Sequence, residues 1–271
     1  MEAESLLQQG KLDECLSTLK LQIQSDPSNS KLRVFLFQAF CASGEWERAL
    51  SQLSVLKDLD PMTMPMVQTY QAAIQCERIR QDVFRGDRAP LVLGEPPPWM
   101  ANLLTVSKLV ADGHVPEALR ARDEALEDAP AVAGTINGQA FEWLADGDSR
   151  LGPVLEVMLN ANYYWVPMIR IARVTIEAPT DLRDLFWLPA NITWSNGGEA
   201  VGLIPVRYPN SETDEDTRIQ LSRMTRWSEP EEGFYVGHGQ RLLTTDSGDH
   251  ALLDTREITF ETAADEQAAV H

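Results

Sequence analysis

Two short segments each bring carboxylates and an arginine within one turn of chain. The first segment comprises Asp146, Asp148 and Arg150, and the second comprises Asp181, Arg183 and Asp184. Carboxylates at this spacing could hold a cation or act as a paired acid and base. They could also cap short helices, with each arginine bonded to a neighbouring carboxylate. We favour the structural interpretation, because neither segment supplies the further oxygen ligands of a calcium loop.

His238 lies between two glycines, which would let a ligand approach its ring. A histidine in a turn that faces water explains this pattern more simply, and we favour it. No two of the four histidines are three or four residues apart, as ligands on one helix face would be. The phosphate loop, the dinucleotide fingerprint and the nucleophile elbow are absent as well. We therefore expect no catalytic residue, metal or cofactor. An enzyme that uses Asp146, Asp148, Asp181 or His238 is the least favoured hypothesis, although distant residues could still form a triad.

The net charge and its distribution along the chain indicate which classes of partner the protein can bind. The net charge is −18, and residues 95–271 hold most of it, with 13 basic and 29 acidic side chains. Nucleic acid and anionic membrane surfaces would be repelled by this half, because binding either requires basic side chains. We expect partners to be proteins.

Three further observations indicate a cytoplasmic protein. No window approaches eighteen uninterrupted apolar residues, so no membrane span is expected. The first residues are acidic and lack the basic and apolar parts of a secretion signal. Cys15, Cys41 and Cys76 lie in helical patterns without metal-ligand spacing, as expected of small buried residues in a reducing compartment.

The elements that must position these side chains begin with three copies of one pattern. Each copy has a glycine, an apolar residue two places on, a small residue five places on and a proline seventeen places on. The copies begin at Gly10, Gly44 and Gly113, and the first two are offset by 34 residues. This period is typical of the tetratricopeptide helix hairpin. The predicted helices span residues 2–9, 11–25, 30–43, 45–59, 65–85, 99–112 and 115–128.

Beyond Pro130 the pattern changes to short strands. Helical spacing persists only over residues 151–160, and Ser195-Asn-Gly-Gly predicts a hairpin turn. The predicted strands span residues 163–167, 169–176, 191–194, 200–208, 235–237, 241–245 and 258–260. We predict an α+β fold. Residues 1–135 form tetratricopeptide-like helical repeats. Residues 136–271 form a small, mainly antiparallel sheet or open barrel with one or two helices and a frayed end.

Several long strings in the second half resemble the ImpE family, also called SciE or TagJ. They are FEWLADGDSRLGP at 141–153, YYWVP at 163–167, PTDLRDL at 179–185 and WSNGGEA at 194–200, and GEPPPW at 94–99 also matches. The resemblance implies an accessory protein of bacterial type VI secretion. Similar proteins are adaptors that associate with the small subunit of the contractile sheath and with the AAA+ unfoldase ClpV. That family has no established catalytic residues.

We therefore expect a non-enzymatic adaptor whose repeat domain receives a helical segment of a partner. Candidates for the groove or its floor are Phe35, Phe37, Phe40 and Trp46, of which at least half must belong to the core. A general cytosolic repeat protein of the cochaperone kind is the alternative. The scarcity of lysine disfavours the carboxylate clamp that such a protein would use.

Overall fold

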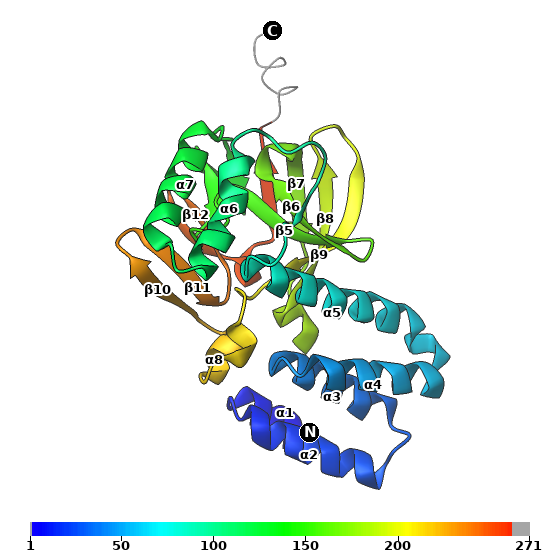
Figure 1. Cartoon of the computed structure of the whole chain (residues 1–271). Coiled ribbons are helices and arrows are strands. Elements are labelled where there is room, and N and C mark those ends of the chain that lie inside the picture. Colours follow the sequence, from blue (N-terminus) through cyan, green and yellow to red (C-terminus); the bar gives the residue numbers. More distant parts are fainter. Residues whose placement is uncertain (1, 262–271) are drawn as a thin grey trace.

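The chain folds into an α+β structure in which helices precede strands, as predicted. A computed structural model describes residues 2–261 (Figure 1). The segment 262–271, for which we expected a frayed end, lies outside the described residues. The helices of residues 2–59 and the strands occupy opposite ends of the molecule in Figure 1, with α5 (Met64–Phe84) between them. The helices of residues 100–128 lie beside the strands.

Every predicted helix of the first half is present, and each end lies within one residue of its predicted position. These helices are α1 (Glu2–Gln8), α2 (Leu12–Ser25), α3 (Ser30–Ala42), α4 (Trp46–Leu59), α5 (Met64–Phe84), α6 (Met100–Ala111) and α7 (Val115–Asp128). Gly44 separates α3 from α4 with φ of +69°, a backbone conformation that side chains larger than hydrogen disfavour. Asp60 ends α4, and its side chain accepts a hydrogen bond from the Met62 N–H just after Pro61. The repeating glycine and proline positions therefore mark the turns of the hairpins.

Within residues 2–261, the largest sheet has nine strands in the order β1-β6-β5-β9-β8-β7-β14-β2-β3. All neighbouring strands are antiparallel except the first pair, in which β1 is parallel to β6. The strands are β1 (Leu91–Val92), β2 (Gly134–Ile136), β3 (Gln139–Phe141), β5 (Val154–Leu159), β6 (Asn162–Pro167), β7 (Ile171–Ile176), β8 (Trp187–Trp194), β9 (Glu199–Pro205) and β14 (Glu257–Phe260). The sheet is larger than predicted, because short strands at 91–92, 134–136 and 139–141 carry little sequence signal.

The predicted helix over residues 151–160 is wrong. This stretch contains β5, whose six residues are all buried. A strand covered on both faces has a continuous apolar run, and such a run cannot be distinguished from a buried helix by periodicity alone. The hairpin prediction nearby is confirmed, since residues 195–198 connect β8 to its antiparallel neighbour β9.

Two smaller sheets lie beside the main one. In the described chain, the first has the order β13-β12-β4 and the second is the ribbon β10-β11. Their strands are β4 (Leu144–Asp146), β10 (Thr225–Glu231), β11 (Phe234–Gly239), β12 (Leu242–Thr245) and β13 (Gly248–Ala251), and a short helix, α8 (Thr217–Gln220), precedes them. Strands β11, β12 and β14 correspond to predicted strands, whereas β4, β10 and β13 were not predicted.

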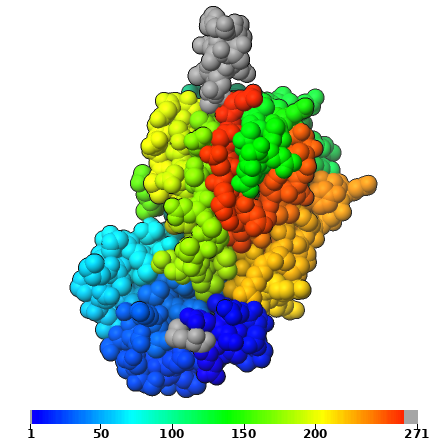
Figure 2. All heavy atoms as spheres, turned by 180° about the vertical axis from the view of Figure 1, so that it is seen from behind, coloured from blue at the N-terminus to red at the C-terminus, as the bar shows by residue number. Residues whose placement is uncertain are grey.

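One hydrophobic core joins the repeats to the sheet. It contains Leu19 and Phe37 from the repeat helices together with Trp165 and Trp187 from the strands. The boundary predicted between residues 135 and 136 falls inside β2, and β1 joins the main sheet from the segment between α5 and α6. Figure 2 shows the repeat helices, in blue to cyan, directly against the strands that follow. The repeat surface is therefore held in place by the second half of the chain.

Candidate functional site

The four aromatic residues predicted to bind a partner lie at different depths. Phe37 is fully buried with its ring centroid 5.8 Å from that of Tyr70, and Phe40 is also buried. Phe35 and Trp46 are half-buried. Trp46 helps to line a surface hollow of about 470 Å³ between α4 and α5. Phe37 and Phe40 can shape a binding surface only from beneath, whereas Phe35 and Trp46 present accessible ring area.

The segment from Asp146 to Arg150 forms ion pairs, but it caps no helix. The Arg150 guanidinium donates to both carboxylate oxygens of Asp148, at 2.8 and 2.6 Å. The Gly237 N–H also donates to Asp148, at 2.9 Å. Asp146 ends β4 and pairs with Arg241 instead. The bond between Arg150 and its neighbouring carboxylate is as predicted, while the helix expected at this segment is wrong.

The second acidic segment has the predicted structural role. Asp181 and Asp184 form a reciprocal capping box at the 3-10 helix Leu182–Leu185. Arg183 lies 3.2 Å from the Asp181 carboxylate. Each of these carboxylates thus has a partner that explains its presence.

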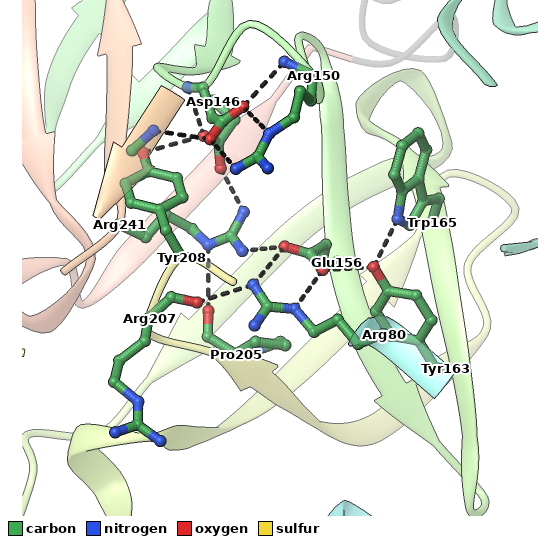
Figure 3. Close-up of polar contacts among 12 residues, drawn as sticks. Arg80, Asp146, Arg150, Glu156, Tyr163, Trp165, Pro205, Arg207, Tyr208 and Arg241 are labelled. Atoms are coloured by element: carbon green, nitrogen blue, oxygen red, sulfur yellow. Dashed lines mark hydrogen bonds and ion pairs between the residues drawn. The ribbon is translucent and has the colours of Figure 1, made fainter. Parts of the chain in front are cut away.

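A buried ionic network connects α5 to three strands (Figure 3). Arg80 of α5 donates to both oxygens of Glu156 on β5, at 2.6 and 3.0 Å. Arg241, next to β12, bridges Glu156 and Asp146. The Tyr163 hydroxyl donates to Glu156 and accepts from the Trp165 indole N–H at 2.6 Å.

No side chain of this network is free to meet a substrate. Glu156 and Arg241 are 0 % exposed, and Arg80 is 3 % exposed. Each carboxylate faces at least one guanidinium, and Arg80 and Arg241 also donate to the carbonyls of Arg207 and Pro205. A buried charge is tolerated when it is paired and hydrogen-bonded in this way. The network therefore fastens the repeats to the sheet.

This network was not predicted from the sequence, because its partners lie far apart in the chain. The residue numbers of Arg80 and Glu156 differ by 76. One signal was present: Glu156 interrupts the apolar run Val154-Leu-Glu-Val-Met-Leu. A carboxylate at the centre of a buried strand requires a cation.

Arginines of the second half also bind the ends of repeat helices. Arg207 donates to the carbonyls of Cys41 and Ala42 at the end of α3, at 3.0 and 2.9 Å. Arg223 donates to the carbonyls of Leu7 and Gln8 at the end of α1, both at 3.0 Å. A helix C-terminus has unpaired carbonyls and a partial negative charge, so a cation stabilises it. These contacts fix the orientation of the hairpins relative to the sheet.

The network makes stability depend on pH. Burial alone would raise the pKa of Glu156, but the guanidinium groups of Arg80 and Arg241 lower it to about 2. Burial, with Asp148 nearby, raises the pKa of Asp146 to about 6 despite Arg241.

We expect Glu156 to contribute about 3 kcal/mol of stability that is present above pH 4.5 and lost as the pH falls towards 2. Asp146 acts in the opposite direction: its contribution is largest at low pH and declines as the pH rises from about 4 through 6. A carboxyl-resolved NMR titration checks both. Protonation of Glu156 in the folded chain near pH 4.5 would contradict the first expectation.

The prediction that His238 lies in a turn facing water is wrong. It lies on β11, is half-buried, and its Nε2 is 3.1 Å from the Ser228 hydroxyl. Burial lowers the pKa of His238, with Arg226 adding to the effect. In residues 2–261, no three histidine, cysteine or acidic side chains gather in a way that could hold a metal ion.

The three cysteines are buried and unpaired, as predicted. Burial raises the pKa of Cys15 to about 11 and that of Cys76 to about 12. The reactive thiolate is therefore disfavoured, and these residues act as small core side chains. Among the described residues, no helix combines the length and the apolar character needed to cross a membrane.

Comparison with known proteins agrees with both halves of this architecture. Residues 138–259 match the model of the ImpE protein family, and residues 6–74 match a tetratricopeptide repeat model. A crystal structure of the protein VPA1032 from Vibrio parahaemolyticus superposes with a TM-score of 0.88 at 23% identity, and the match covers 97% of this chain and 99% of that one. At that identity, the likeness shows the fold alone.

A curated relative shows the family. The type VI secretion system accessory component TagJ of Pseudomonas aeruginosa is 48% identical over 261 residues, which are 96% of this chain and 92% of TagJ. The matched span includes both the repeat helices and the sheets. This chain belongs to the ImpE family of type VI secretion accessory proteins.

Proposed function

We propose that this chain is a non-enzymatic adaptor in the bacterial cytoplasm that binds the small subunit of the contractile sheath, the ClpV unfoldase, or both. The observation that carries the proposal is the 48% identity with an accessory component of type VI secretion over nearly the whole chain. Helix hairpins of the tetratricopeptide type support it, because their stacked surfaces hold other polypeptides. Buried, fully paired carboxylates support the absence of catalysis.

The repeat surface supplies the docking site in this proposal. Phe35 and Trp46 would insert between apolar side chains of a partner helix at i, i+3, i+4 and i+7. Glu47 and Arg78 line the hollow beside Trp46 and form an ion pair with each other. Phe37 and Phe40 would form the buried floor of this surface, and the ring of Trp46 packs against that of Trp187, with centroids 6.3 Å apart.

Alanine at Phe35 or Trp46 is expected to weaken binding of the purified sheath small subunit by about 2 kcal/mol or more, which is roughly 30-fold in Kd. Leu21→Ala is the matched control, because Leu21 is a large apolar residue, 66% exposed, on another repeat helix. Isothermal titration calorimetry gives the affinities, and thermal unfolding verifies that each variant is folded. If the folded Phe35 and Trp46 variants bind as tightly as the control, this surface is not the docking site.

A further inference from the structure

A second apolar groove lies on the opposite half of the molecule from the first two repeat hairpins. It consists of two adjoining hollows of about 310 and 440 Å³, which share Leu126, Trp143 and Ala145 in their linings. One side is formed by the end of α7, and the other by β4, β12 and the β10-β11 ribbon. Strand β12 and the ribbon lie beside α7 in Figure 1. We call this surface the α7 groove.

Large apolar side chains project into the α7 groove and stay accessible. They are Leu126, Trp143, Ile169, Trp227 and Tyr235, and their exposed fractions range from 36% to 45%. Scattered apolar residues are normal on a surface, but several aromatic rings gathered around one hollow typically mark a binding site. Tryptophan and tyrosine are also the residues that most often dominate binding energy.

Three carboxylates lie at the edge of the groove, and we call them the rim. Asp249 lines one of the hollows and is exposed. Glu229 accepts a hydrogen bond from the N–H of the lining residue Gly233, and Glu229 and Glu232 raise the pKa of the lining residue Tyr235. In the described part of the chain, none of these three acidic residues forms an ion pair.

One cation lies within the lining, and it is already engaged. Arg122 is the only basic residue among the described residues that line the two hollows. Its guanidinium is 2.7 Å from the Asp123 carboxylate and donates to the Gly233 carbonyl at 3.0 Å. The rim therefore keeps a negative potential, which selects a positively charged occupant.

We propose that the α7 groove binds a basic amphipathic segment of a partner protein. Apolar side chains of that segment fill the two hollows, and its lysine or arginine side chains meet the rim carboxylates. The rim repels nucleic acid and anionic lipid, so a protein segment is the occupant that matches both the apolar floor and the charge. This surface is separate from Phe35 and Trp46, and the proposal does not rest on binding of the sheath subunit.

The test uses the intact chain and a fluorescent synthetic helix with leucines on one face and lysines on the other. Trp143→Ala is expected to weaken binding about 30-fold by fluorescence anisotropy, with Ile169→Ser as a second groove variant. Leu21→Ala should stay within about twofold, because Leu21 lies on α2.

Two double variants that change the net charge equally test whether the rim carboxylates contribute to binding. Asp249→Lys combined with Glu232→Lys is expected to weaken peptide binding about tenfold and to reduce the salt dependence of that binding. Asp13→Lys combined with Asp58→Lys changes the net charge equally on exposed positions of the repeats and should have a much smaller effect. Circular dichroism and thermal unfolding confirm that all five variants are folded.

Three results would overturn the proposal. The first is equal weakening by the rim pair and the repeat pair, which would indicate nonspecific attraction to an acidic protein. The second is equally tight binding of a peptide in which glutamates replace the lysines. The third is a dimer in light scattering that Trp143→Ala converts to a monomer, which would show that a second copy of this chain occupies the groove.

Discussion

Glu156→Gln is expected to lower the free energy of unfolding by about 3–5 kcal/mol. The amide keeps the shape of the side chain but removes the negative charge that Arg80 and Arg241 share at 0 % exposure. The two guanidinium groups would then remain buried with Asp146 and the more distant Glu77 as their acidic neighbours. Urea unfolding monitored by tryptophan fluorescence measures the change, because Trp165 is bonded to the network through Tyr163.

A surface pair is the matched control for this substitution. Arg173 and Glu257 also lie on neighbouring strands, 3.3 Å apart, but both side chains are about half exposed. Glu257→Gln should change the free energy of unfolding by less than about 1 kcal/mol, because water screens an exposed pair. Similar losses in the two variants would mean that the buried network does not fasten α5 to the sheet.

Trp187→Ala is expected to cost about 3–5 kcal/mol of unfolding free energy. Trp187 is fully buried where the sheet meets the repeats, with ring centroids 5.7 Å from Tyr70 and 6.3 Å from Trp46. Its indole N–H donates to Glu77 at 2.8 Å, so the substitution also leaves a buried carboxylate with one hydrogen bond fewer. Removing this side chain leaves a cavity between the two halves of the chain.

The ring of Trp187 packs against that of Trp46, so the substitution also bears on the proposed docking site. If the sheath subunit docks there as proposed, Trp187→Ala should weaken that binding even where the variant remains folded. Trp143→Ala, at a position that is 39% exposed, should cost about 1 kcal/mol or less in stability. Chemical denaturation measures the loss of unfolding free energy in Trp187→Ala and in Trp143→Ala. Equal losses in the two variants would contradict the placement of Trp187 in a core shared by the repeats and the sheet.

Local sequence patterns predict much of the fold. The helix hairpins were predictable because turns at Gly10 and Gly44, and stops at Pro27 and Pro61, repeat with one spacing. Strands with one exposed face were predictable too: in β7, Val174 and Ile176 are buried while the intervening residue is exposed. Strand β5 was not, because burial on both faces removes the alternation.

The features that the sequence did not predict depend on contacts between residues far apart in the chain. The helix-capping arginine Arg207 follows its acceptor, the Cys41 carbonyl, by 166 residues, and no local pattern connects them. The α7 groove likewise combines Leu126 with Trp143 and Trp227, which the fold brings together from three elements. By contrast, the ion pair of Asp148 with Arg150 was predictable because the two residues are nearly adjacent.

The repeats and the sheets are joined at several points. The core is continuous, Arg80 and Arg241 bridge it with charges, and Arg207 holds the end of α3. In the proposed adaptor, the repeat surface and the α7 groove would then keep a fixed relative orientation, so two partners could be held at a set distance.

The most direct test is a calorimetric titration of the intact chain with the purified sheath small subunit and, separately, with the N-terminal domain of the ClpV unfoldase. An adaptor role predicts a saturable complex with at least one of them, and the complex should be weakened by Trp46→Ala but not by Leu21→Ala. Failure of the folded wild-type chain to bind either protein would contradict that role.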